Sequence, residues 1–332
     1  MNKRATFTRI AAVMTMSAAL VGATMAQTTI RYAHVGSEGD IQYWYAEEFA
    51  ERVAERTDGR ITVQVFPNSQ LGGAQETVDG VRSGAIPLAH HEFASLATLM
   101  PDIAAFAAPF AYRDGSHAMA ATDPQNSEIM QELAEQLVEE ANIRIIGRLY
   151  RGARQMTANK AVYSPADLAG ERFRGVPMQL WTTMINGMGA VPTPVEVAEL
   201  PTALMTGMVI GQENPLTMIN ANRLYEVQTH AMLTAHMQNV LPVFINETFW
   251  QSLSEEDRTI LSEVAAEIGE ETLELGLAAE QDLIQELTDK GMTFITADDG
   301  LDVEAFRTAV SAQVAADYPS WGPLIERIQA IQ

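Results

Sequence analysis

Apolar and polar residues alternate along several short stretches in the first half of the chain, and a helical repeat separates these stretches. Residues 28–34 and 60–66 alternate, which predicts β-strands. The large apolar residues between 41 and 56 recur every four positions, which predicts a helix. The same criteria predict helices over 74–83 and 128–141 and strands over 86–90 and 143–150. This order favours an α/β fold in which helices cover the faces of parallel strands.

The second half of the chain repeats this alternation and then enters one long helix. Ser254 is placed to cap that helix, because residues 255–257 are all acidic and acidic side chains favour a helix N-terminus. The helix is predicted to reach Asp289, about 50 Å at about 1.5 Å per residue, with kinks at Gly269 and Gly276. Before it, strands are predicted over 172–174, 208–211, 231–236 and 242–246, helices over 180–188 and 199–206, and a turn over 191–194.

The two series of elements predict two α/β lobes. No linker or low-complexity segment separates them, so the chain is expected to cross between the lobes more than once. Ligands of open α/β sheets bind beyond the carboxyl ends of the strands. Between two lobes, that position is a cleft.

The first 26 residues have the order of an export signal. Lys3, Arg4 and Arg9 form a basic start, residues 10–22 form a short apolar run, and small residues lead to Ala26. The apolar run is shorter than the roughly 20 residues of a membrane-spanning helix. We therefore predict a signal peptide over 1–26, cleaved after Ala26, and a periplasmic location. An uncleaved N-terminal anchor is the alternative.

Composition and charge narrow the classes of function. The chain has 332 residues, 47% of them apolar, which is typical of a globular protein with room for two lobes. It has no cysteine, which excludes disulfides, thiolate metal sites and a lipoprotein anchor. The net charge is −22, and it becomes −25 without residues 1–26, which hold three basic residues and no acidic one. This acidity argues against nucleic acid as a partner.

One basic stretch stands out in this acidic chain and indicates an anionic ligand. Its six arginines fall within 31 residues: Arg144, Arg148, Arg151, Arg154, Arg172 and Arg174. Arginine suits a carboxylate because its planar guanidinium group makes two parallel hydrogen bonds. Arg174 is predicted at the end of a strand, Arg154 just after another, and Asn214 in a Gln-Glu-Asn-Pro segment that follows a third. Paired surface arginines and a turn-forming asparagine are the alternatives.

Catalytic motifs are absent from the sequence. It has no Gly-x-Ser-x-Gly elbow and no Walker motif, and Gly187 and Gly189 lack the third glycine of a dinucleotide fingerprint. His90 and His91 are neighbours on a predicted strand, so they point to opposite faces, and we expect one at the core or cleft edge and the other exposed. We therefore predict no catalytic residue, metal or cofactor. A secreted enzyme acting on carbohydrate acids stays open as the alternative.

An ordered set of segments resembles the solute-binding proteins of TRAP (tripartite ATP-independent periplasmic) transporters of the dicarboxylate-binding type. The segments are Phe66–Gly72, Arg151–Lys160, Ser164–Arg174, Gly189–Pro194, Leu204–Pro215 and Leu224–Gln228. The resemblance implies a two-lobed periplasmic binding protein, type II-like, with a long helix spanning both lobes. Residues 27–151 and 240–279 would form lobe I, and residues 152–239 and 280–332 lobe II.

The resemblance also implies site residues and partners. Arg174 matches the arginine that binds the ligand carboxylate, and Arg154 matches a second arginine that many members have. Asn214 matches an asparagine beside that carboxylate. Glu92 matches an acidic residue that faces the ligand in some relatives. One departure is Ile210, where the family usually has aspartate. The chain also lacks the additional basic residue that sialic-acid binders have shortly after the Glu92 position, which argues against sialic acid as the ligand. The implied partners are the small and large permease subunits, with the protein itself a monomer.

The side chains available to the rest of a ligand favour a sugar acid. His34, Gln42 and Glu92 offer hydrogen bonds to hydroxyl groups, and the Trp181 ring offers a surface for a sugar face. A hexuronate is therefore the preferred ligand. Small hydroxy or keto acids, C4-dicarboxylates, sulfonates and ectoine-like zwitterions remain alternatives.

Overall fold

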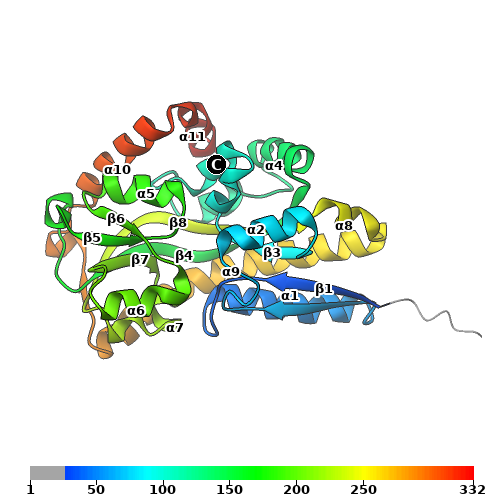
Figure 1. Ribbon diagram of the computed structural model, residues 1–332, viewed down its shortest axis with the longest axis horizontal. Helices are drawn as coiled ribbons and strands as arrows, with labels where there is room; N and C mark the ends of the chain where they lie inside the picture. Colours follow the sequence, from blue (N-terminus) through cyan, green and yellow to red (C-terminus); the bar gives the residue numbers. More distant parts are fainter. Residues whose placement is uncertain (1–26) are drawn as a thin grey trace, which may run out of the picture.

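A single mixed sheet runs through the whole molecule. The computed structural model describes residues 27–332, and the predicted signal peptide over 1–26 lies outside them. Within these residues the sheet has the strand order β2-β1-β3-β8-β4-β7-β5-β6, with β9 paired to β8 (Figure 1). The strands are β1 (Thr28–Ala33), β2 (Ile61–Phe66), β3 (Leu88–His90), β4 (Ile143–Ala158), β5 (Arg172–Gly175), β6 (Val191–Pro194), β7 (Gly211–Pro215), β8 (His230–Asn246) and β9 (Thr293–Ile295).

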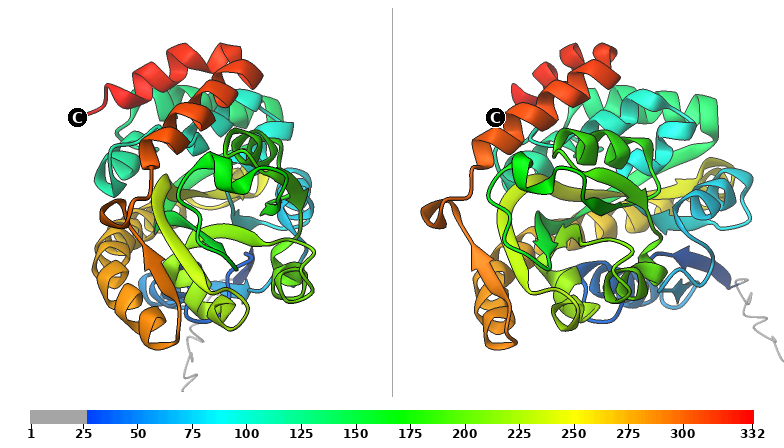
Figure 2. Two further views of the ribbon diagram at one scale, coloured as in Figure 1. Left: turned by 90° about the vertical axis from the view of Figure 1, so that its left-hand side faces the viewer. Right: turned by 60° about the vertical axis from the view of Figure 1, so that its left-hand side comes forward.

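Helices cover both faces of this sheet. In Figures 1 and 2, α1 and α9 lie on one side, and α4, α5, α10 and α11 lie on the other. The helices are α1 (Ile41–Arg56), α2 (Ala74–Ser83), α3 (Gly115–Ala121), α4 (Glu128–Ala141), α5 (Gln179–Gly187), α6 (Leu200–Met205), α7 (Leu216–Ala221), α8 (Glu247–Ser252), α9 (Glu255–Asp289), α10 (Val303–Asp317) and α11 (Gly322–Gln329). Among residues 27–332, no helix has both the length and the apolar character needed to cross a membrane.

Two long strands, β4 and β8, join the two lobes. They pair antiparallel along most of their length, with β3, β1 and β2 beside one end and β7, β5 and β6 beside the other. The prediction of separate strands over 231–236 and 242–246 is wrong, because they form the single 17-residue strand β8. Polar residues at 238 and 239 interrupt the apolar pattern there, and Asn239 is buried at the centre of the polar site described below.

The hydrophobic core shows how the two lobes are connected. On one face, a single cluster extends from Val81 in α2 to Phe306 in α10, so it serves both lobes. On the other face there are two separate clusters. The N-terminal part of α9 contributes Leu261 to one, and the C-terminal part contributes Leu287 to the other. The long helix therefore spans both lobes, and Ser254 caps it as predicted.

The glycines of α9 allow close packing and do not interrupt the helix, which is continuous from Glu255 to Asp289. A Cβ atom at Gly269 would lie 2.5 Å from the carbonyl oxygen of Arg148, and one at Gly276 would lie 2.8 Å from the ring of Tyr150. Both neighbours belong to β4. The glycines thus bring α9 against the strand that joins the lobes.

We expect Gly269→Ala to destabilise the protein by about 1–3 kcal/mol, because the new methyl group must displace the backbone of β4. Urea unfolding followed by tryptophan fluorescence measures this change. Gly322→Ala in α11 is the control, since no atom lies within 4 Å of its Cβ position. Equal stability of the two variants would show that α9 can move away from β4 at little cost.

The end of the chain returns to the neighbourhood of α3. In α11 and just after it, the carbonyl groups of Gln329 and Ile331 accept hydrogen bonds from Arg113, at 3.0 and 2.7 Å. The carbonyl group of Ile328 is 3.0 Å from Nε2 of His117 in α3. The last helix therefore packs against α3 and the segment that contains Arg113.

Candidate functional site

A polar cavity of about 40 Å³ lies between the lobes. That volume accommodates about one to a few water molecules. Lobe I, the β4 strand and lobe II all contribute to its walls. The polar residues that line it are Asp40, Gln42, His91, Glu92, Arg151, Arg154, Arg174, Glu196, Asn214 and Asn222.

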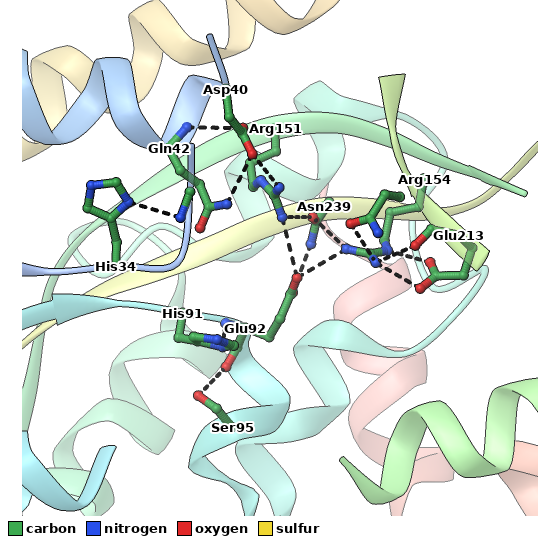
Figure 3. A network of polar contacts seen from close by, with 12 residues as sticks. His34, Asp40, Gln42, His91, Glu92, Ser95, Arg151, Arg154, Glu213 and Asn239 are labelled. Carbon is green, nitrogen blue, oxygen red and sulfur yellow. Dashed lines mark hydrogen bonds and ion pairs between the residues drawn. The ribbon is translucent and has the colours of Figure 1, made fainter. Parts of the chain in front are cut away.

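A β-bulge places two arginines of β4 side by side. Residues three apart on a regular strand point to opposite faces. Between the pairs Tyr150–Val240 and Ala153–Gln238 the register shifts, so two residues of β4 lie opposite one residue of β8. As a result, Arg151 and Arg154 both donate to Oδ1 of Asn239, each at 3.1 Å. Figure 3 shows this arrangement. Arg154 therefore lies within β4, and not after its end as predicted.

Arg154 is fully engaged by protein groups. Its Nε donates to Oε2 of Glu213 and its Nη2 donates to Oε1 at 2.8 Å, so the ion pair is bidentate. Its Nη1 donates to Glu92 at 3.2 Å. Burial alone would raise the pKa of Glu213, but the adjacent Arg154 charge outweighs it and holds this pKa well below its usual value. The guanidinium group of Arg154 is thus held in one position.

Two further residues hold Glu213 in place. Nε1 of Trp181 donates to its Oε1 at 2.7 Å, and Nε2 of His236 lies 3.1 Å from its Oε2. The Trp181 ring also lies under Arg154, with 5.3 Å from the guanidinium carbon to the ring centroid. Trp181 is fully buried and does not line the cavity. Its position supports Arg154, whereas the sequence suggested a surface for a sugar ring.

Glu92 and Asn239 lie between the two arginines. Nδ2 of Asn239 donates to Oε2 of Glu92 at 2.8 Å, and Oε1 of Glu92 lies 3.2 Å from Arg154 and 3.7 Å from Arg151. Burial raises the pKa of Glu92, and the two arginine charges oppose that rise. The acidic side chain of Glu92 lines the cavity.

Asn214 lies within a strand. The prediction of a strand over 208–211 that ends before the Gln-Glu-Asn-Pro segment is wrong, because β7 begins at Gly211 and includes this segment. Nδ2 of Asn214 donates to Gln212 at 2.6 Å, and its Oδ1 accepts from Arg154 at 3.1 Å. The sequence pattern did not reveal this strand because its residues 212–214 are polar. In the structure they are buried, and each has a hydrogen-bond partner. The predicted turn over 191–194 is likewise a strand, β6, which pairs with β5.

Arg174 differs from the other arginines of the basic stretch. Among residues 27–332, no carboxylate lies within 4.0 Å of its guanidinium nitrogens, and its one hydrogen bond is from Nε to the carbonyl oxygen of Val195, at 2.9 Å. The side chain is only 2% exposed and lines the cavity. Burial lowers the pKa of Arg174 to about 10, so it remains a cation at neutral pH.

Four of the six arginines pair with protein carboxylates, and the fifth is on the surface. Arg144 pairs with Glu247, Arg148 with Asp123 and Glu270, Arg151 with Asp40, and Arg154 with Glu213 and Glu92. Arg172 is exposed, and its Nη2 donates to the carbonyl oxygen of Gly207 at 3.3 Å. Arg174 is therefore the buried arginine of the basic stretch that has no carboxylate partner among residues 27–332.

The remaining predicted residues lie at the lobe I side of the cavity. Gln42 lines the cavity and donates from Nε2 to Asp40 at 3.2 Å. His34 lies behind this wall, and burial lowers its pKa to about 4, so the ring is neutral. The expectation that one of His90 and His91 is exposed is wrong, because both are buried. Among the described residues, no group of three histidine or acidic side chains is placed to hold a metal ion.

Several residues of the site were missed in the sequence. Arg151 was seen only as part of the basic stretch, and Glu213 only as part of the motif around Asn214. Asn239 and His236 carried no signal of their own, since isolated polar residues in or beside predicted strands are common. Asp40 directly precedes the predicted helix over 41–56, where an aspartate is expected as an N-cap, so its place in the site was not recognised. An uncompensated polar residue inside an apolar strand is costly, and this cost is the signal that could have identified Asn239.

The comparisons with known proteins agree with this geometry. The family model of the bacterial extracellular solute-binding proteins, family 7 (DctP), matches residues 32–318. The chain belongs to this family. It is 33% identical over 329 residues to a solute-binding protein of Roseobacter denitrificans, covering 97% of this chain and 98% of that protein. It is 30% identical over 320 residues to the 2,3-diketo-L-gulonate-binding periplasmic protein of Escherichia coli, covering 95% of each.

A solved structure is similar over nearly the whole fold of this solute-binding protein. The crystal structure of a TRAP periplasmic solute-binding protein from R. denitrificans with bound L-galactonate matches with a TM-score of 0.84 and 31% identity, covering 92% of this chain and 99% of that chain. The protein is thus a TRAP-type solute-binding protein, and its predicted two-lobed α/β fold with a long helix is confirmed. Proteins of this family are periplasmic, bind small organic acids and work with membrane permease subunits.

Proposed function

We propose that this solute-binding protein captures a sugar acid, such as a hexuronate or the corresponding aldonate, and delivers it to its TRAP permease. The observation that carries the proposal is the buried Arg174 guanidinium, which faces the cavity without a carboxylate partner among the described residues. A ligand carboxylate supplies the missing anion, and the planar guanidinium group binds it with two parallel hydrogen bonds.

The rest of the cavity supports a polyhydroxylated ligand. Asp40, Glu92 and Gln42 present oxygen atoms that accept hydrogen bonds, and hydroxyl groups can donate to them. A second ligand carboxylate cannot donate, and it would meet the negative charges of Asp40 and Glu92. Several similar proteins were crystallised with sugar acids, including L-galactonate in a protein from Actinobacillus succinogenes and β-D-glucuronate in one from R. denitrificans.

We expect L-galactonate or D-glucuronate to raise the melting temperature more than succinate, ectoine or sialic acid. A ligand at 100 times its Kd adds about 2.7 kcal/mol to the free energy of unfolding, which a thermal-shift screen detects. Recovering the ligand unchanged after incubation distinguishes binding from catalysis by a secreted enzyme. A response to none of the sugar acids, together with a response to a dicarboxylate, would overturn the proposal.

We infer that residues 27–151 with 240–279 and residues 152–239 with 280–321 move as two lobes, with α11 on lobe I. The site supports this division, because Arg174 and Asn214 come from one lobe and Asp40, Gln42 and Glu92 come from the other. Because residues of both lobes line the cavity, we expect ligand entry and release to involve a hinged motion of the lobes.

We expect a saturating sugar acid to reduce the radius of gyration of the protein in small-angle scattering, because the ligand is held between the lobes and favours the closed form. Arg174→Gln, mixed with the same concentration of ligand, is the control and should keep the radius of the free protein. An unchanged radius for the wild type at saturation would argue against closure.

We also propose that the mature chain begins after Ala26, acts as a monomer in the periplasm and contacts both the small and the large permease subunits. The family match and the periplasmic relatives support this location. Amino-terminal sequencing and the sedimentation of the exported protein test these points.

A further inference from the structure

Four buried polar atoms lack a hydrogen-bond partner among the described residues, and all four lie at one end of the site. They are Nε2 of His34, Oε1 of Gln42, Nε2 of His90 and Nε of Arg151. Buried polar groups without partners are rare, so a cluster of them requires an explanation. Gln42 and Arg151 line the cavity, whereas the stacked rings of His34 and His90, with centroids 4.9 Å apart, lie behind them.

The contacts around these atoms show which of them donate and which accept. Nε2 of Gln42 donates to Oδ2 of Asp40 at 3.2 Å, so the free amide atom is the oxygen, and a flipped amide would place two oxygens together. The terminal nitrogens of Arg151 donate to Asp40 at 2.8 Å and to Asn239 at 3.1 Å, which leaves its Nε–H free.

His34 holds a further free donor, but it lies behind the wall that Gln42 forms. Its Nδ1 accepts from the backbone N–H of Gly36 at 3.1 Å, so the proton of the neutral ring lies on Nε2. A Cβ atom on Gly36 would lie 2.6 Å from Cβ of Gln42 and 3.2 Å from Nδ1 of His34, which shows how closely the two side chains approach. At the cavity, Gln42 therefore presents one unpartnered acceptor and Arg151 one unpartnered donor, whereas the unpartnered Nε2 atoms of His34 and His90 lie behind its wall.

One chemical group matches this set. A hydroxyl group donates one hydrogen bond and accepts two. A carboxylate only accepts, so it would leave Gln42 unpartnered and place a negative charge beside Asp40. An ammonium group only donates, so it would leave Arg151 unpartnered. A methyl group would satisfy none of them.

We propose that Gln42 and Arg151 form a hydroxyl subsite for the end of the ligand opposite its carboxylate. Figure 3 shows Gln42, Asp40 and Arg151 at one side of the network and Arg154 and Glu213 at the other, with Glu92 and Asn239 between them. The inference rests on the proposed function and adds a specificity to it. The protein selects monocarboxylic sugar acids with a distal hydroxyl group over their 6-deoxy and dicarboxylic analogues.

Three ligands that differ at one carbon test the subsite. L-Fuconate is L-galactonate without the hydroxyl group on C6, and galactarate has a carboxylate there. We expect calorimetry to give L-galactonate at least a tenfold lower Kd than either analogue, because each analogue leaves buried polar atoms unpartnered. Equal Kd values for L-galactonate and L-fuconate would overturn the subsite and leave the proposed function standing.

Gln42→Met gives an independent measurement, because methionine keeps the length of the side chain and removes the amide, so that both its free oxygen and its Nε2 hydrogen bond to Asp40 are lost. We expect it to raise the Kd for L-galactonate at least tenfold and to change the Kd for L-fuconate less than threefold. Gln131→Met on α4 makes the same exchange outside the cavity and should change neither value.

The outcomes separate the two proposals. If Gln42→Met binds L-galactonate like the wild type, the cluster holds a buried water molecule and the subsite is wrong. If the wild type binds D-glucuronate and not L-galactonate, the same variant must weaken D-glucuronate at least tenfold, and unchanged binding overturns the subsite. If the wild type binds none of these sugar acids, the proposed function fails and the subsite fails with it.

Discussion

Replacing Arg174 by lysine should weaken sugar-acid binding at least tenfold, and replacing it by glutamine should weaken binding about a hundredfold or more. Lysine keeps the charge and loses the two parallel hydrogen bonds of the guanidinium group. Glutamine also removes the charge, and losing one partner of a buried hydrogen-bonded charge pair costs about 2–5 kcal/mol. Calorimetry with the best ligand of the thermal-shift screen measures both changes.

Replacing Arg174 by glutamine should lower the affinity for the ligand without lowering the melting temperature of the ligand-free protein. In the free protein, Arg174 is a buried cation without a carboxylate within 4.0 Å among the described residues, and burial lowers its pKa to about 10. Arg174→Gln removes this unfavourable charge, so the variant should melt at or above the temperature of the ligand-free wild type. Arg172→Gln is the matched control, because it changes an exposed arginine of the same strand and should leave affinity unchanged. Wild-type affinity in Arg174→Lys would remove Arg174 from the site.

Glu213→Gln should destabilise the protein by about 3–5 kcal/mol at pH 7, because it leaves Arg154 without its bidentate partner in a buried position. Glu213 and Arg154 are at most 1% exposed, so solvent does not screen the lost interaction. Urea unfolding monitored by tryptophan fluorescence measures the difference. Glu171→Gln breaks the surface pair with Lys160 and should cost no more than about 1 kcal/mol. Equal losses in the two variants would contradict a special role for the buried pair.

The pH dependence of this difference follows from the low pKa of Glu213 in the folded protein. A carboxyl group whose pKa is lower in the folded state stabilises the protein above its unfolded pKa, which is about 4.3 for glutamate. That contribution is lost as the pH falls below this value towards the folded pKa. The gap in stability between wild type and Glu213→Gln should therefore be constant from pH 6 to 8 and should narrow below about pH 4.5. A gap that is unchanged at pH 3.5 would mean that Glu213 does not act through its charge.

Local patterns in the sequence determined most of the elements and the ligand class. Alternation and helical repeats predicted most of the helices and strands, because one face of each element packs on a hydrophobic core. Ser254 and the acids after it predicted the start of α9, because capping depends on a few neighbouring residues. The basic stretch around Arg174 predicted an anionic ligand, since charge is a property of composition.

Only the tertiary structure decided how the site is assembled. The bulge at Arg151 and Gly152 sets which face of β4 each arginine takes, and it depends on pairing with β8, 80 or more residues away. Pairing between β4 and β7 likewise explains why the polar strand β7 was not predicted correctly. Its side chains form hydrogen bonds with residues that are distant in sequence. Tertiary structure also decides why Arg154 has a carboxylate partner and Arg174 has none among the described residues. Both are buried arginines within strands, but the fold brings Glu213 to Arg154 and brings no carboxylate of residues 27–332 within 4.0 Å of Arg174. Charge neutralisation depends on distances in space, and these are set by the packing of the lobes.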